Sequence, residues 1–234
     1  MKLWFVEDLL TIIKDYSMSF IELKNISYSY PDDDKKIFEH FSMNVESGEC
    51  LIIRGDNGSG KTTLFRILNG LAIPQSGSYI FDDTDINHKF LKDNQNSKRF
   101  HKRIGYLFQN PDIMLFNGKV YNEIAFGPRQ MGWSEDDVKK RTEDCMELLG
   151  ITVLADKAPY HLSGGQKKKV ALAAILALNP DLLILDEPFA GLDKNAKEFL
   201  IKFLIEWKAS GKTLIIATHD DRLTEVLADR VLEL

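Results

Sequence analysis

The 234-residue sequence lacks long apolar runs, is poor in cysteine and has no excess of positive charge. No stretch reaches the about 18 apolar residues of a membrane-spanning helix, so we expect none. Cys50 and Cys145 are the only cysteines, and they suit neither a disulfide framework nor a metal site, which favours a reducing cytoplasm. The net charge of −5 argues against a nucleic-acid partner, because domains that bind nucleic acid are usually basic.

The composition is that of an ordinary globular protein, with 44% hydrophobic and 28% charged residues. We expect one domain over residues 18–234. Residues 1–17 carry apolar side chains at helical spacing, which predicts a short amphipathic helix. The alternative is that Met18 is the true start and that residues 1–17 are an over-called extension.

A glycine-rich run, Gly55-Asp56-Asn57-Gly58-Ser59-Gly60-Lys61-Thr62, fits the phosphate-binding pattern G-x-x-x-x-G-K-[ST]. An apolar strand is expected just before it, at 50–53, and a helix just after it, at 63–69. That order lets backbone N–H groups converge on phosphate oxygens. The run predicts a nucleoside triphosphate site made by Gly55, Asn57, Gly58, Ser59, Gly60, Lys61, Thr62 and Thr63.

Two further motifs follow the glycine-rich run. Leu162-Ser163-Gly164-Gly165-Gln166 stands at an expected helix start, which is a second anion site. Leu182-Leu183-Ile184-Leu185-Asp186-Glu187 is an apolar strand that ends in two carboxylates. In this order the three motifs resemble those of the ATP-binding cassette (ABC) ATPases, over about Phe20 to Leu234.

The alternation of expected strands and helices predicts an α/β fold with a parallel sheet. The resemblance implies a P-loop cassette with a mainly parallel core sheet, an N-terminal antiparallel β subdomain and an inserted helical subdomain at about 110–165. We expect residues 83–103, which are polar, to form an exposed connection. Other strands are expected at 20–23, 26–30, 41–45, 104–108 and 214–217, and other helices from Ser134 to Leu149 and from Ser163 to Leu178.

The resemblance also implies roles in ATP binding and hydrolysis. Asp186 would hold Mg²⁺ together with Thr62 and Gln109, and Lys61 would contact the β- and γ-phosphates. Glu187 would orient the attacking water, with His219 at the γ-phosphate and Gln109 near the metal and the water. Tyr30 matches the aromatic residue that stacks on adenine, with Tyr28 as the alternative. Both tyrosines could instead simply pack in a strand.

The second motif implies a dimer. In the family, Ser163, Gly164, Gly165 and Gln166 face the γ-phosphate held by a second subunit, and Asp193 belongs to a loop that crosses the interface. The second ATPase subunit would be an identical or a different chain. We interpret the following Lys167-Lys168-Lys169 as a solvated helix face.

Two segments resemble the energy-coupling-factor and cobalt/nickel importer ATPases in particular: Gln109-Asn110-Pro111-Asp112 with Leu115-Phe116, and Ala190-Gly191-Leu192-Asp193. They imply an ATPase at the cytoplasmic face of the membrane that powers import of a metal ion or a vitamin-type solute through integral membrane partners. One alternative is a soluble ABC ATPase with a non-transport partner. A second is a nucleotide-binding module without hydrolysis, against which Glu187 and His219 argue.

Overall fold

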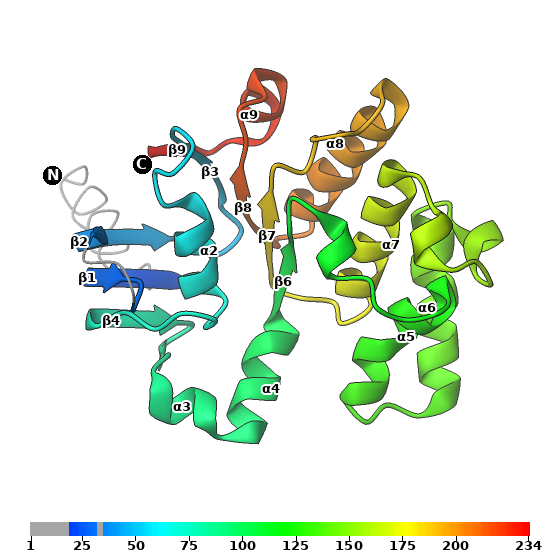
Figure 1. The fold of residues 1–234 in the computed structure, drawn as a ribbon, viewed down its shortest axis with the longest axis horizontal. Coiled ribbons are helices and arrows are strands. Elements are labelled where there is room, and N and C mark those ends of the chain that lie inside the picture. Colours follow the sequence, from blue (N-terminus) through cyan, green and yellow to red (C-terminus); the bar gives the residue numbers. More distant parts are fainter. Residues whose placement is uncertain (1–18, 32–34) are drawn as a thin grey trace, which may run out of the picture.

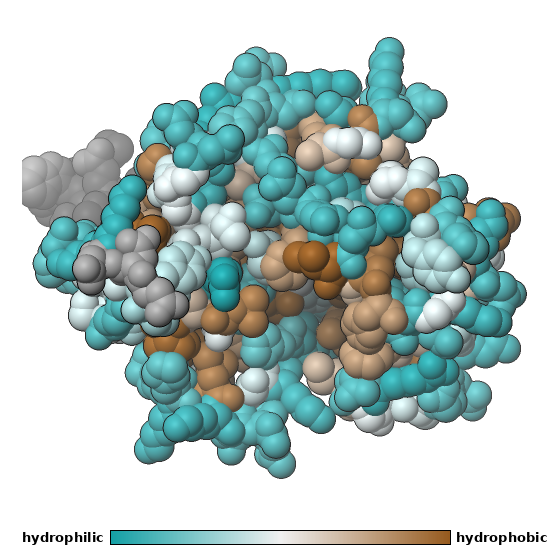
Figure 2. Space-filling view, in the orientation of Figure 1, coloured by the Kyte–Doolittle hydropathy of each residue, from teal (hydrophilic) through white to brown (hydrophobic). Residues whose placement is uncertain are grey.

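The computed structural model describes residues 19–31 and 35–234, so both interpretations of residues 1–17 lie outside the described residues. The described chain contains a five-stranded parallel sheet and a four-stranded antiparallel sheet, with helices around the parallel sheet (Figure 1). The same view in space-filling form shows a hollow between the side that carries the antiparallel sheet and the helical side (Figure 2). The expectation of an α/β fold with a parallel core sheet and an N-terminal antiparallel sheet is confirmed.

The parallel sheet has the order β6-β7-β8-β3-β9 and the antiparallel sheet the order β2-β1-β4-β5. The strands are β1 (Ile21–Ser29), β2 (Lys36–Val45), β3 (Cys50–Arg54), β4 (Ser76–Phe81), β5 (Thr84–Asp85), β6 (Ile104–Leu107), β7 (Leu182–Asp186), β8 (Thr213–Ala217) and β9 (Arg230–Glu233). The helices are α2 (Lys61–Leu68), α3 (His88–Lys92), α4 (Asn94–Arg103), α5 (Val120–Gln130), α6 (Glu135–Leu148), α7 (Gly164–Leu176), α8 (Lys194–Ala209) and α9 (Asp221–Leu227). No helix of the described residues is long and apolar enough to cross a membrane.

The central strands are apolar on both faces because both faces of the parallel sheet are covered. In β3, Cys50 and Ile52 belong to one buried cluster, whereas Leu51 and Ile53 belong to the other. Successive side chains of a strand point to opposite faces, so a continuous apolar run fills two cores at once. This explains why the sequence shows unbroken apolar runs at the core strands.

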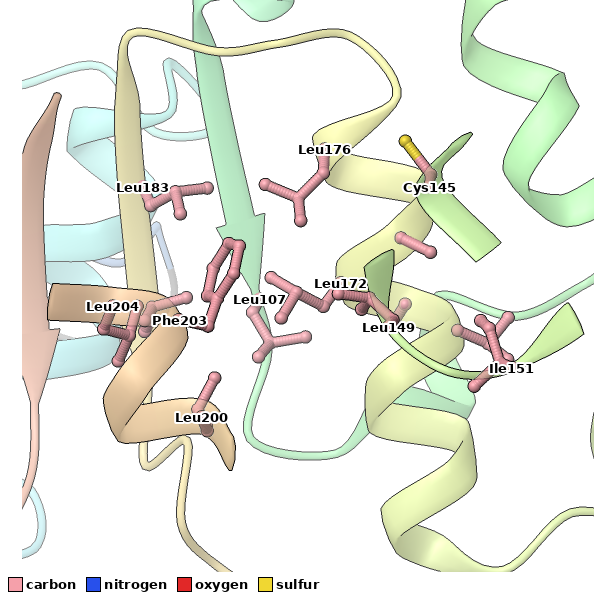
Figure 3. Packing of buried hydrophobic residues seen from close by; sticks show 14 of the residues in the cluster. Leu107, Cys145, Leu149, Ile151, Leu172, Leu176, Leu183, Leu200, Phe203 and Leu204 are labelled. Atoms are coloured by element: carbon pink, nitrogen blue, oxygen red, sulfur yellow. The ribbon is translucent and has the colours of Figure 1, made fainter. Parts of the chain in front are cut away.

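One cluster joins the parallel sheet to helices α5–α9. Leu172 and Leu176 of α7 point toward Leu107 of β6 and Leu183 of β7 (Figure 3). All four side chains are at most 3% exposed. Helix α7 is therefore fixed against the strands that end at the acidic pair.

The other cluster joins the parallel sheet to the antiparallel sheet through α2. Leu64 and Phe65 of α2 are fully buried between Ile21 of β1 and the strands β3 and β7. This packing holds the first turn of α2, which begins at Lys61, against the end of β3.

The segment 83–103 is largely exposed, as expected, but the sequence did not indicate its regular structure or its buried side chains. This segment forms β5, α3 and α4, and Asp93 caps α4 by accepting from the N–H groups of Gln95 and Asn96 at 2.9 and 2.8 Å. Phe100 is 3% exposed, and its ring centroid lies 5.4 Å from that of Phe81. Phe100, together with Ile86 at 2% exposure, anchors the segment, and the average polarity of the sequence hides both side chains.

Between β6 and α7 the chain is mostly helical. It contains α5, α6 and three short 3-10 turns at Pro111–Ile113, Thr152–Leu154 and Pro159–His161. Ser134 caps α6 by accepting from the N–H of Asp137 at 3.2 Å, and Gly150 follows the helix with a φ of 63°. The boundaries of the helical subdomain at about 110–165 stay a prediction.

Candidate functional site

The glycine-rich loop between β3 and α2 needs its glycines for two reasons. Gly55, Gly58 and Gly60 have φ values of 147°, 86° and 106°, which side-chain-bearing residues rarely adopt. A Cβ on Gly55 would also lie 2.6 Å from the carbonyl oxygen of Leu234. The Lys61 ammonium donates to the carbonyl oxygens of Gly55 and Asp56 at 2.5 and 2.9 Å, so it lies over the loop.

A cleft of about 310 Å³ opens beside this loop. The predicted site residues that line it are Tyr30, Asn57, Gly58, Gly60, Lys61, Thr62, Thr63, Gln109, Asp186 and Glu187, together with Ile37, which the sequence did not indicate. These residues come from the ends of β1, β3, β6 and β7 and from the starts of β2 and α2. The carboxyl ends of neighbouring parallel strands meet at one edge of a sheet, and this edge is where α/β proteins bind ligands.

Tyr30 lies at the cleft, whereas Tyr28 lies in the core. The Tyr30 hydroxyl is 3.0 Å from the Thr63 hydroxyl, and the Arg66 guanidinium lies 5.8 Å from the Tyr30 ring centroid. Tyr28 is 9% exposed and meets Tyr30 edge to face at 5.3 Å. Of the two tyrosines, Tyr30 is therefore the one placed to contact a base.

Asp186 is the last residue of β7 and is 7% exposed. Burial, and then the negative charge of Glu187, raise the pKa of its carboxyl group above the ordinary value. A divalent cation in the cleft would offset both effects. The hydroxyl of Thr62, the amide of Gln109 and this carboxylate are oxygen donors of the kind that Mg²⁺ uses beside substrate phosphates.

Glu187 has an unusual backbone. Its φ is 43°, a conformation that costs about 1–3 kcal/mol in a residue other than glycine, and its N–H donates to the carbonyl of Ala217 at 3.0 Å. Its Oε1 is buried and has no hydrogen-bond partner among the described residues. Nε2 of the exposed His219 lies 3.6 Å from that oxygen. The Glu187 carboxylate thus lies at the end of the sheet, in the lining of the cleft, with one oxygen that lacks a hydrogen-bond donor in the described part of the chain.

The serine-glycine motif lies in a separate cleft of about 370 Å³. The Ser163 hydroxyl accepts from the N–H of Gln166 at 3.3 Å, and the Gln166 side chain accepts from the N–H of Ser163 at 3.0 Å, which together cap α7. Ser163, Gly165 and Gln166 line this cleft with Asp193, which caps α8. Within the described chain, the two clefts share no lining residue.

The interpretation of Lys167-Lys168-Lys169 as a solvated helix face was wrong. Lys167 pairs with Asp112 at 2.6 Å, and its side chain is 18% exposed. Lys169 donates to the carbonyl of Leu149 at 3.1 Å. Lys168 is 5% exposed and lies against the segment after β7. One signal was available, because Lys168 precedes the apolar Ala171 and Leu172 by three and four residues and so shares their helix face.

A second buried charge was also missed by sequence reasoning. Glu123 on α5 is 4% exposed and accepts from the backbone N–H groups of Phe116 and Asn117 at 3.0 and 2.7 Å. It therefore fixes the end of the segment that follows Gln109. Nothing in its local sequence distinguishes it from an exposed helical glutamate.

Comparison with known proteins gives matches along most of the chain. The family model described as "ABC transporter" matches residues 38–190. A nickel import ATP-binding protein of Lactiplantibacillus plantarum is 47% identical over 210 residues, which cover 90% of this chain and 86% of that protein.

Solved structures agree with the sequence matches. One is cbiO1 of Clostridium perfringens, described as part of an ABC transporter complex, at 37% identity and a TM-score of 0.79, covering 92% of this chain and 84% of that one. Another is a dimeric ATP-binding cassette in a post-hydrolysis state with ADP and Pi, at 27% identity and a TM-score of 0.82. That match covers 92% of this chain and 94% of the other.

Proposed function

The chain belongs to the ABC transporter family and is an ATP-binding, ATP-hydrolysing cassette, and from that premise we propose that it powers a metal-ion importer. Its 47% identity to a nickel import ATP-binding protein favours a transition-metal ion over a vitamin-type solute. The observation that carries the mechanism is the division of the site residues between two clefts.

The first cleft would bind ATP. Tyr30 would stack on adenine, and the loop from Gly55 to Gly60 would surround the phosphates with backbone N–H groups. The Lys61 ammonium would exchange its two carbonyl partners for the β- and γ-phosphates. Thr63 is buried and bonded to Tyr30, so its role is to hold that ring as well as to begin α2.

Mg²⁺ would be held by Thr62, Gln109 and Asp186 together with phosphate oxygens. When bound, the ion would neutralise charge that develops on the phosphates. The position of Asp186 supports this assignment, because a buried carboxylate at the cleft is suited to pairing with a cation.

Glu187 would orient or deprotonate the attacking water. Its side chain lines the first cleft and is 22% exposed, so a water molecule in the cleft can reach the carboxylate. His219 does not line the first cleft, but its Nε2 lies 3.6 Å from Glu187 Oε1, close enough to take part once ATP is bound. In phosphoryl transfer, positioning and electrostatics supply most of the catalysis, so a fixed carboxylate is the expected device.

A second ATPase subunit would complete each site. Ser163 and the start of α7 present N–H groups to an anion, yet they line a different cleft from Lys61. In a two-fold dimer, the Ser163 cleft of each subunit would meet the phosphates held by the other. Asp193, beside Ser163, would lie at this interface. The partner is an identical or a related chain.

Integral membrane proteins would dock near the turn that follows Gln109, at the cytoplasmic face of the membrane. Ile113 and Phe116 are 66% and 67% exposed, and Phe126 of α5 is 40% exposed. Hydrophobic side chains gather over this region, between β6 and α5, in the face that Figure 2 shows. A group of exposed apolar side chains on one part of the surface favours contact with another protein.

The test is uptake of radioactive nickel by cells that express the chain with the membrane proteins that co-purify with it. We expect uptake that depends on the chain and that Glu187→Gln abolishes. Uptake of a labelled vitamin in place of nickel would contradict the proposed substrate but support the proposed importer function. Hydrolysis by the wild-type chain that responds only to a soluble partner would instead support the non-transport alternative.

A further inference from the structure

Lys168 makes three hydrogen bonds to one short segment. Its ammonium donates to the carbonyl oxygens of Glu187, Pro188 and Ala190 at 3.0, 3.0 and 2.7 Å. A lysine has three N–H donors, so all of them are used. The segment that they hold begins with the residue that carries the catalytic carboxylate.

Burying this ammonium is costly, which argues that its position is specific. Lys168 is 5% exposed, whereas its neighbour Lys167 keeps 18% of its side chain exposed in a surface ion pair. Burial lowers the pKa of Lys168 to about 8, against the opposing effect of the Glu187 and Asp186 carboxylates. A lysine can usually reach solvent with its long side chain, but here three carbonyl groups replace the water.

The held segment is strained at the residue that matters. Glu187 has a φ of 43°, and its carbonyl accepts both the Lys168 ammonium and the N–H of Ala190 at 3.0 Å. A left-handed conformation persists only where the surroundings fix it. The Ala217 carbonyl fixes Glu187 from one side and Lys168 from the other.

Lys168 also belongs to the helix that starts at Ser163. The two residues are five positions apart, about one and a half turns along α7. Gly165 of the same helix lies near the end of the held segment, since a Cβ there would be in ordinary contact, 3.7 Å, with Cδ2 of Leu192, just before Asp193. The start of α7, from Gly165 to Lys168, therefore lies beside the segment 187–192.

We propose that Lys168 is a positioning residue for hydrolysis, which fixes the backbone of Glu187 to helix α7 through the three carbonyl groups. The orientation of the catalytic carboxylate then depends on the helix whose first residues line the second cleft. This inference rests on the proposed role of Glu187 in ATP hydrolysis. Lys168 thereby has a role in hydrolysis although its ammonium contacts three backbone carbonyl groups and not the phosphate-binding residues of either cleft.

The test compares Lys168→Met, which keeps the length and removes the donors, with the control Lys202→Met, which changes an exposed lysine of α8 that lines neither cleft. Full-length protein is assayed for kcat and KM with Mg-ATP, for ATP affinity by titration with a fluorescent nucleotide, and for Tm. We expect Lys168→Met to lower kcat roughly 10- to 100-fold, because small displacements of a catalytic group have effects of that size. KM and ATP affinity should stay within about twofold of the control, because the phosphate loop is untouched.

Lys168→Gln is the rescue variant, since its amide keeps two N–H donors, and its kcat should lie between those of wild type and Lys168→Met. A kcat for Lys168→Met equal to that of Lys202→Met would overturn the proposal. So would equal losses of kcat and ATP affinity, which would show general damage. If Lys168→Met does not fold, Lys168→Gln against Lys202→Gln decides in the same way. A wild-type chain without hydrolysis would instead reject the proposed function itself.

Discussion

The Lys167 ammonium lies 2.6 Å from Oδ1 of Asp112 and joins helix α7 to the turn that follows Gln109. The Asp112 side chain is 59% exposed, so the pair lies at the surface and contributes at most about 1 kcal/mol. Asp112 therefore has two possible roles. It can form the ion pair with Lys167 of the same chain, and it can face a basic residue on a membrane partner beside Ile113 and Phe116.

Asp112→Lys should weaken recovery of the membrane complex while ATP affinity stays unchanged, because the phosphate loop is distant in the chain and intact. The measurement is co-purification in detergent with a parallel ATP titration. The swapped variant Asp112→Lys/Lys167→Asp rebuilds the internal pair with reversed charges. We expect it not to restore the complex, because Asp112 meets the partner. Full restoration by the swap would assign Asp112 to the internal pair alone.

Glu187→Gln should slow hydrolysis at least about 100-fold, because it removes the charge that orients or deprotonates water. ATP binding should survive, and trapped ATP should hold two subunits together. Light scattering after size-exclusion chromatography, with and without Mg-ATP, measures the association, and phosphate release measures the rate. An ATP-independent monomer with near wild-type hydrolysis would contradict both the catalytic role and the shared site.

Lys61→Ala and Ser163→Arg should complement each other if each ATP site uses both clefts. Lys61→Ala removes a charge-assisted contact to phosphate, which should weaken ATP binding about 10- to 100-fold. Ser163→Arg should block the second cleft and leave ATP binding intact. Each variant alone should be nearly inactive. An equal mixture should recover about a quarter of wild-type hydrolysis, because half the dimers regain one of two sites.

No recovery in that mixture, with dimers present, would place both clefts' residues in one subunit's site. Lys61→Ala alone, at twice its concentration in the mixture, is the control for an effect of total protein concentration.

Asp181→Asn should lower stability at neutral pH and lose that effect in acid. Burial acts to raise the pKa of Asp181, but hydrogen bonds from Arg103 and Lys212 outweigh it and place the pKa below the ordinary 3.8. A group with a lowered folded-state pKa stabilises the fold above its unfolded-state pKa, and this contribution disappears as pH falls through the folded value. Chemical denaturation from neutral pH to below 3.8 measures this difference. A gap between wild type and variant that stays constant with pH would exclude the ion pairs as its cause.

Gly105→Ala should destabilise the protein by about 1–3 kcal/mol through overpacking. A Cβ at Gly105 in β6 would lie 2.2 Å from Cγ2 of Ile175 and 2.8 Å from Cδ2 of Leu183. Gly118→Ala is the control, because a Cβ there meets nothing within 4 Å. Thermal unfolding should show a lower Tm for Gly105→Ala alone. Equal Tm values would mean that β6 and α7 separate at little cost.

Local sequence patterns predicted the parts of this protein that depend on neighbouring residues. The run from Gly55 to Thr62 lies between a strand and a helix, as predicted. The pattern is local because the tight loop needs glycine and the strand before it needs apolar residues. The capping pair Ser163 and Gln166 follows from a four-residue pattern. The carboxylates of Asp186 and Glu187 stand at a strand end, as an apolar run followed by two acids indicates.

Only the tertiary structure decided which of these local pieces meet. Burial of Phe100 and Lys168 depends on Phe81 and on the carbonyls of residues 187, 188 and 190, all distant in the sequence. Composition measures an average over neighbours, so one buried side chain in a polar segment leaves little trace in it. The same holds for the two clefts. The sequence alone determined the chemistry of Lys61 and of Ser163. The packing of α2 and α7 against different parts of the sheet placed these two residues in separate clefts, because long-range contacts fix distances that spacing along the chain does not encode.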